Sequence, residues 1–167
     1  MVVLGLDLSL NSSGYAVVNG YDVLTLGRIA QSNNDDTPAK LNRIYQTLDE
    51  IILIYKPEVV VIEHAFVGRN AKTHQLLSMV HGVVQLLIHK YQLLYVYVTP
   101  REIKKALGDV KADKNYIGRT VRQLFNIPLD VEGILEREKK QDDMTDALAI
   151  CYTFLNRQDG RTEAYGT

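Results

Sequence analysis

The chain has 167 residues, of which 46% are apolar and 23% are charged. This composition is typical of a soluble globular protein, and the length suits one domain with a sizeable core rather than two. The single cysteine, Cys151, excludes an intrachain disulfide, and its apolar neighbours indicate a buried thiol. No apolar run approaches the roughly 20 residues that span a bilayer. Because the start of the chain also lacks a basic leader, we expect a cytoplasmic protein.

The formal net charge of −1 gives the whole chain no electrostatic attraction to nucleic acid. Basic residues are nevertheless concentrated between Arg101 and Arg122, a segment that contains seven Lys and Arg residues but only three acidic residues. Such a segment is either a DNA-binding patch or an ordinary solvated helix surface, and charge alone does not choose between them.

The first thirty residues have the pattern of three strands. Residues 2–8 form an apolar run, residues 14–18 a second, and residues 23 to 28 or 29 a third. The turn residues 11–14 separate the first two strands, and Asn19-Gly20 is a strong hairpin signal before the third. We therefore predict that the chain opens as an antiparallel meander.

Helices and strands alternate in the remainder. A helix is predicted from Pro38 to the stop at Lys56-Pro57, and a buried strand over Glu58 to Glu63. A helix over about 70–91, a strand over 92–98 and helices over about 100–107, 111–125 and 142–155 follow. This order predicts an α/β fold with one mixed sheet flanked by helices. We expect residues 1–156 to form the domain and residues 157–167 a flexible tail.

Four carboxylates occupy positions that are hard to explain as solvated surface. Asp7 and Glu63 close two apolar strands, where an ionised side chain is costly unless it is paired or bound to a metal. Asp143 and Asp146 are three residues apart at the start of a helix and so project from one face. Helix capping is an alternative explanation for this second pair.

Oxygen ligands suit hard cations such as Mg²⁺, and two such ions roughly 4 Å apart can activate a water and stabilise a leaving phosphodiester oxygen. The four histidines lack zinc spacing, and the chain has no glycine-rich phosphate loop of the Walker type. Residue chemistry and spacing therefore predict a two-metal phosphodiesterase site, and no more than that.

Three motifs carry these acids in order: Gly5-Leu6-Asp7-Leu8-Ser9 with Ser13 to Ala16, then Val61 to Phe66 with Asn70-Ala71, and finally Asp143 to Ile150. They resemble the RuvC family of Holliday junction resolvases, which are endonucleases of the RNase H-like superfamily. The resemblance spans about residues 1–155 and implies an RNase H-like mixed five-stranded sheet. It also implies a homodimer that nicks two opposing strands of a four-way DNA junction with Mg²⁺ or Mn²⁺, two ions per site.

The resemblance also implies roles for individual residues. Asp7, Glu63, Asp143 and Asp146 match the catalytic, metal-binding acids of the family, although Asp142 is a rival to its neighbour. Phe66 matches an aromatic that wedges against bases near the crossover, yet it could instead pack its loop onto the next helix. Lys104 and Lys114 match basic positions that face DNA. We extend this expected DNA-binding surface to Arg69, Lys105 and Lys111.

The helix predicted over about 70–91 is apolar around more of its circumference than one buried face requires. We predict that the surplus face forms the homodimer contact, as this helix does in the family.

Two features depart from the family pattern. The segment 126–142 is longer and more charged than expected, and His64 and Ala65 are unusual beside the glutamate. Two alternatives therefore stay open. One is a related nuclease acting on RNA or on a broader range of branched DNA. The other is a non-catalytic or ATP-binding module of the actin-like fold, which the length disfavours because that fold needs two such domains.

Overall fold

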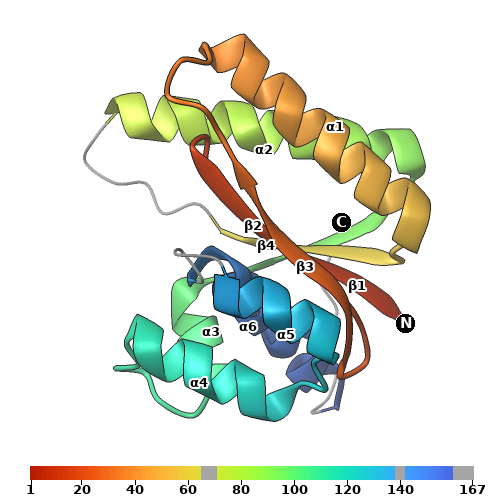
Figure 1. The fold of residues 1–167 in the computed structure, drawn as a ribbon, viewed down its shortest axis with the longest axis vertical. Helices are drawn as coiled ribbons and strands as arrows, with labels where there is room; N and C mark the ends of the chain where they lie inside the picture. The colour runs from red at the N-terminus through yellow and green to blue at the C-terminus, as the bar shows by residue number, and fades with distance from the viewer. Residues whose placement is uncertain (65–70, 138–141, 160–167) are drawn as a thin grey trace.

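The computed structural model describes residues 1–64, 71–137 and 142–159. It contains one mixed five-stranded sheet, as predicted, and the strand order is β3-β2-β1-β4-β5 (Figure 1). The strands are β1 (Val2–Asp7), β2 (Ser12–Asn19), β3 (Asp22–Ala30), β4 (Val59–Glu63) and β5 (Leu94–Val98). The first three form the expected antiparallel meander, whereas β4 runs parallel to β1 and β5 parallel to β4. The strand that carries Asp7 is therefore central.

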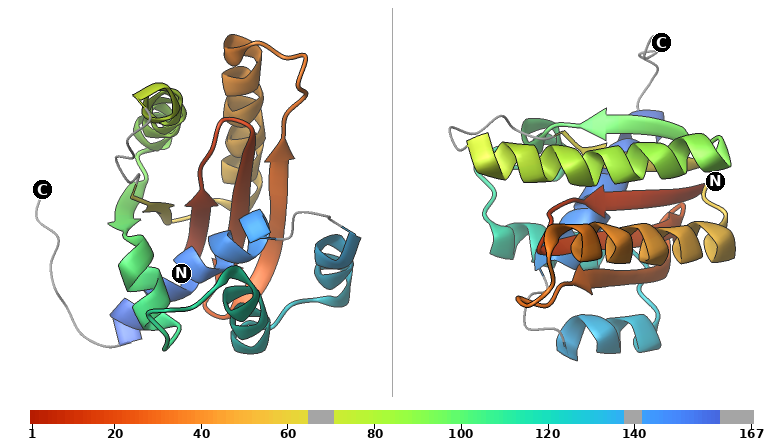
Figure 2. Two further views of the ribbon diagram at one scale, coloured as in Figure 1. Left: turned by 90° about the vertical axis from the view of Figure 1, so that its left-hand side faces the viewer. Right: turned by 90° about the horizontal axis from the view of Figure 1, so that it is seen from above.

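Helices cover both faces of the sheet. One face is covered by α1 (Thr37–Tyr55) and α2 (Ala71–Tyr91), which pack side by side (Figures 1 and 2). On the other face lie α3 (Pro100–Ala106), α4 (Lys114–Leu124), α5 (Leu129–Arg137) and α6 (Asp142–Asp159). Within the described part of the chain, no helix is long and apolar enough to cross a membrane.

Alternation along the strands assigns each side chain to one of two cores. Leu4 and Leu6 of β1 point into the core beneath α1 and α2, whereas Val3 belongs to the core beneath α6. Gly5 and Asp7 share the face of Val3 because they follow it at intervals of two residues. The same alternation places Glu63 of β4 on that face, since Val59 and Val61 belong to the α6 core. Both strand-end acids therefore face α6.

Helix α6 lies directly on β1 and β2 because glycines leave room for its backbone. A Cβ added at Gly5 would lie 2.6 Å from the carbonyl oxygen of Ala147, and one at Gly14 only 1.8 Å from that of Asp143. The buried thiol of Cys151, predicted from its neighbours, lies on the same side of the helix and donates to the carbonyl oxygen of Ala16 over 3.7 Å. Two glycines thus set the distance between the sheet and the helix that carries the last two acids.

The segment 126–142 differs from its expected role as a charged connection. It contains α5, whose Val131 and Leu135 are buried in the α6 core and whose Ile134 packs against that core. The spacing of these three residues is helical, but it covers little more than one turn and is surrounded by charges, so the pattern was weak. In addition, α6 continues to Asp159 and includes the first residues of the expected tail.

Replacing Gly14 with alanine is predicted to destabilise the protein by about 2 kcal/mol or more, because the new methyl group meets backbone that cannot rotate away. Urea denaturation followed by circular dichroism measures this. Gly118→Ala is the control, since the nearest atom to its added Cβ is the Thr145 hydroxyl at an ordinary 3.7 Å. Alanine at that helical position should be neutral or stabilising. Equal stability of the two variants would contradict the close approach.

Candidate active site

The acids at the ends of β1 and β4 are neighbours across a parallel strand pair. Leu6 pairs with Ile62 in the sheet register, so Asp7 and Glu63 follow at the same edge. Both side chains are half-buried and face α6. Burial raises the pKa of the Glu63 carboxyl above its usual value, and the negative charge of Asp146 raises it further.

Helix α6 brings the second pair of acids to this edge. The pKa of Asp7 rises to about 7, chiefly through burial and in smaller part through repulsion from Asp146, Glu63 and Asp143. The pKa of Asp146 rises to about 6, chiefly through burial, although Lys114 opposes the shift. The four acids expected to act together thus share one electrostatic environment, which makes it costly for all of them to be ionised without a cation.

Lys114, at the start of α4, supplies positive charge at this cluster. Its Nζ lies 3.9 Å from Asp146 Oδ2 and 3.5 Å from Asp142 Oδ2. Asp142 is exposed and pairs with the lysine, whereas Asp143 is among the charges that raise the pKa of Asp7. Asp142 and Asp143 both lie in the first turn of α6, where the helix dipole also favours acids. Of the two, Asp143 is the acid coupled to Asp7.

Two residues at this site were not identified from the sequence as functional. The hydroxyl of Ser12 donates a hydrogen bond to Asp143 Oδ2, and Nη1 of Arg28 donates to Ser12 Oγ over 3.4 Å. Sequence patterns marked Ser12 only as a turn residue and Arg28 only as the end of a strand. Nothing in their spacing indicates that α6, more than a hundred residues later, would lie beside them.

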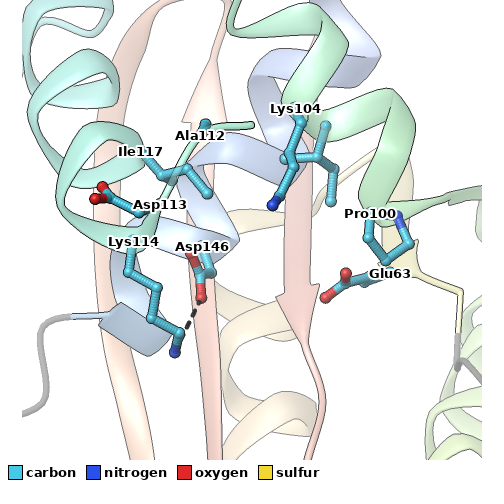
Figure 3. A pocket seen from close by; sticks show the side chains of 9 residues that line it. Glu63, Pro100, Lys104, Ala112, Asp113, Lys114, Ile117 and Asp146 are labelled. Carbon is cyan, nitrogen blue, oxygen red and sulfur yellow. Dashed lines mark ion pairs between the residues drawn. The ribbon is translucent and has the colours of Figure 1, made fainter. Parts of the chain in front are cut away.

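A cavity of about 400 Å³ opens beside the acids (Figure 3). Lys104 points towards the space between Glu63 and Asp146, and Lys114 pairs with Asp146 from the side away from Glu63. Apolar side chains complete the wall: Pro100, Ile103, Ala112 and Ile117. Two of the four expected DNA-binding lysines, Lys104 and Lys114, therefore line the same cavity as Glu63 and Asp146, whereas Lys105 and Lys111 are exposed and line neither this cavity nor the smaller one. The other two expected DNA contacts, Phe66 and Arg69, lie outside the described residues.

A second cavity, of about 210 Å³, is lined by Asp7 and also by Glu63, which it shares with the first. Its wall includes His64 and His81, whose rings both contact Tyr97 at centroid distances of 5.5 and 6.2 Å. The sequence had singled out His64 only as a departure from the family pattern. Glu63 thus belongs to both a lysine-lined cavity and a histidine-lined one.

The donor chemistry of the acid cluster fits a hard cation. Carboxylate oxygens are the ligands that Mg²⁺ and Mn²⁺ prefer. Burial, and in smaller part repulsion between the acids, raises the pKa values of Asp7, Glu63 and Asp146, and a cation would stabilise their ionised forms. Among the described residues, however, no three Asp, Glu, His or Cys side chains lie close enough together to hold one ion. A cation bound by three or four of these acids would therefore require their carboxylates to lie closer together than they do in this structure.

Comparisons with known proteins agree with this site. The model of the RuvC family, described as crossover junction endodeoxyribonuclease RuvC, matches residues 3–154. RuvC of Alkaliphilus metalliredigens is 35% identical over 157 residues, which are 90% of this chain and 90% of that protein. RuvC of Chloroherpeton thalassium is 33% identical over 155 residues, which are 90% of this chain and 79% of that protein.

Solved structures share the fold. The structure of T. thermophilus RuvC in complex with Holliday junction substrate matches with a TM-score of 0.80 at 21% identity, over 96% of both chains. The yeast mitochondrial Holliday junction resolvase Ydc2 matches with a TM-score of 0.71 at 14% identity, over 92% of this chain and 78% of that one.

The fold is that of an RNase H-like nuclease. The chain belongs to the RuvC family and is a metal-dependent endodeoxyribonuclease.

Without metal, the stability of the protein is predicted to fall as the pH rises from about 4 to about 7. The folded Asp7 keeps its proton up to a pKa of about 7, whereas the unfolded carboxyl loses it near 3.8. The folded state therefore binds more protons in this window, so raising the pH removes stability that is fully present below it. Urea midpoints measured in EDTA across this range test the slope.

The Asp7→Asn variant is the control for that titration, because it removes the shifted carboxyl and should flatten the slope. Millimolar Mg²⁺ should raise the midpoint most at the upper end of the range, where the acids are ionised. A midpoint that rises with pH in EDTA, or that responds equally in the Asn variant, would contradict the assignment.

Proposed function

We propose that this endonuclease resolves four-way DNA junctions by paired, symmetric nicking, and that Asp7, Glu63, Asp143 and Asp146 are its catalytic, metal-binding acids. The observation that carries the proposal is the electrostatic coupling of these four carboxylates at one sheet edge. Membership of the RuvC family supports the junction as substrate. Junction resolution would place the protein in DNA recombination and repair.

The four acids would hold two Mg²⁺ ions, with Mn²⁺ able to substitute, and the bound ions would supply an activated water and charge stabilisation at the leaving oxygen. The chain's own residues do the rest. The parallel pairing of β1 and β4 fixes Asp7 and Glu63 relative to each other, and α6 adds Asp143 and Asp146 from the face of the sheet that it covers. The apolar walls of the larger cavity limit the water that surrounds the scissile phosphate.

Basic side chains would place the DNA backbone. Lys104 and Lys114 flank the acids and could each neutralise a phosphate on either side of the cut. Lys105 and Lys111 are exposed on the same segment, where they could contact the more distant arms of a junction. Arg69 and Phe66 remain proposals from the family resemblance, with Phe66 stacking on a base that the junction leaves unstacked.

Replacing each acid by its neutral amide should abolish cleavage but leave junction binding. Asp7→Asn, Glu63→Gln, Asp143→Asn and Asp146→Asn lower the ligand charge without changing side-chain size, and the lysines that bind phosphate stay in place. Cleavage of a fixed four-way junction in Mg²⁺, with binding measured by fluorescence anisotropy in Ca²⁺, separates the two properties. Loss of both together, with loss of the folded spectrum, would mean that the acids hold the fold instead.

Comparison of four substrates tests the junction itself: a fixed four-way junction, a replication fork, a linear duplex and a hairpin RNA. We expect the junction to be cut fastest. If duplex or RNA is cut as fast, the alternative of a broader RNase H-like nuclease is correct. Membership of the RuvC family gives no support to the alternative of an ATP-binding module. A nucleotide titration that shows no binding would exclude that alternative.

We further propose a homodimer through α2, because two sites related by a two-fold axis suit two symmetric nicks. Val80, Val84 and Leu87 of this helix are buried within the protein, yet Met79 and Leu86 are 39% and 66% exposed. These two exposed residues are seven apart and so lie on one stripe of the helix. This stripe is the surplus apolar face predicted from the sequence.

Leu86→Asp should convert the dimer to a monomer, because it introduces a charge into an apolar contact. Sedimentation velocity at micromolar concentration without DNA measures the change. Leu129→Asp is the matched control: Leu129 is 92% exposed at the start of α5, on the opposite side of the sheet. The proposal fails if the unmodified protein is itself a monomer, or if both variants dissociate alike.

A further inference from the structure

The carboxylate of Asp143 is held by two neighbouring strands that carry none of the four acids. Ser12, the first residue of β2, faces α6 and donates its hydroxyl proton to Asp143 Oδ2. Two residues further along β2, Gly14 allows the backbone of Asp143 to approach closely. One strand therefore fixes both the main chain and the side chain of this acid.

The hydroxyl of Ser12 is itself oriented from both sides. On one side, the backbone amide of Ser12 donates to Ser9 Oγ over 3.1 Å. The same loop is closed by the Ser13 hydroxyl, which donates to the carbonyl oxygen of Ser9 over 2.6 Å. From β3, Arg28 Nη1 donates to Ser12 Oγ over 3.4 Å. The Ser12 oxygen thus accepts from Arg28 at one lone pair, while its O–H donates to Asp143. The positive guanidinium also polarises the hydroxyl and strengthens the bond that it donates.

The two acids of α6 are thus held in different ways. Asp146 meets Lys114, an exposed and flexible side chain, at 3.9 Å. Asp143 accepts a hydrogen bond from the side chain of a serine on a strand. This side chain has one rotatable bond before its oxygen and loses little conformational entropy when it is fixed. The bond from Ser12 to Oδ2 restricts the orientation of the Asp143 carboxylate.

We infer that Ser12, oriented by Arg28, is a positioning residue that fixes the Asp143 carboxylate for metal binding. This inference rests on the proposed role of Asp143 as a metal ligand. Partners that orient a metal-binding carboxylate typically change metal affinity or activity by about 10- to 100-fold when they are removed. The effect is exerted through Asp143, because Ser12 itself donates to the acid and not to the substrate.

The test compares Ser12→Thr with Ser12→Val, two side chains of nearly the same shape of which only threonine keeps the hydroxyl. Both are β-branched and suit the first position of a strand. Mn²⁺ affinity, measured from the free-ion electron paramagnetic resonance signal, is the first readout and needs no DNA. The valine variant should bind Mn²⁺ about tenfold more weakly, while the threonine variant should match the unmodified protein.

Cleavage gives the second readout. At fixed Mg²⁺ and saturating junction, Ser12→Val should lower the single-turnover rate without changing the Kd for the junction, and higher Mg²⁺ should restore part of the rate. Arg28→Met should have a smaller effect in the same direction. Thr25→Val removes a hydroxyl from β3 on the opposite face of the sheet and should change neither readout. Thermal unfolding of each variant confirms that it is folded.

Asp143→Asn distinguishes the two ways to fail. If this variant binds Mn²⁺ as tightly as the unmodified protein, Asp143 is not a ligand, and both the proposed site and the role of Ser12 are overturned. If Asp143→Asn binds weakly but Ser12→Val and Ser12→Thr bind equally well, the site stands and the role of Ser12 is overturned.

Discussion

The contact of α6 with β1 and β2 is the constraint on which the rest of the site depends. Side chains normally separate a helix from the sheet on which it packs. Here Gly5 and Gly14 remove those side chains, so the carbonyl groups of Ala147 and Asp143 approach the strands directly. Without this approach, Asp143 and Asp146 would lie too far above the sheet edge to share an environment with Asp7 and Glu63.

Bringing four acids together stores electrostatic repulsion, and the surrounding residues relieve it unequally. Asp7 is the most strained of the four, with a pKa of about 7 caused by burial and by three neighbouring carboxylates. Lys114 offsets part of the charge at Asp146, and Ser12 does so with a single hydrogen bond at Asp143. Neither relief is complete, and a hard cation is the partner that would complete it. Because this repulsion remains in the folded state, binding of a metal ion should stabilise the protein against unfolding.

Local patterns were sufficient for most of the fold. The β-branched run ending at Glu63 identified a strand covered on both faces, and the Asn19-Gly20 turn identified the hairpin before β3. The helix predicted from about residue 100 is α3, and in the structure Thr99 and Glu102 form a capping box at its start. The helix α5 was missed because its apolar face is one turn long and gains its stability from β3, which is distant in the sequence.

The sequence by itself determined that Asp7 and Glu63 end buried strands and that Asp143 and Asp146 share one helix face, because these statements follow from periods of 2 and 3.6 residues. The motif order determined the family. Only the tertiary structure decided which neighbours control those acids. Ser12, Arg28 and Lys114 act across the gap between a sheet and two helices, and contacts between segments so far apart leave no local period to read. The four acids and Lys114 could be found in the chain, whereas the Ser12 hydroxyl and the Arg28 guanidinium become neighbours of Asp143 only in the folded protein.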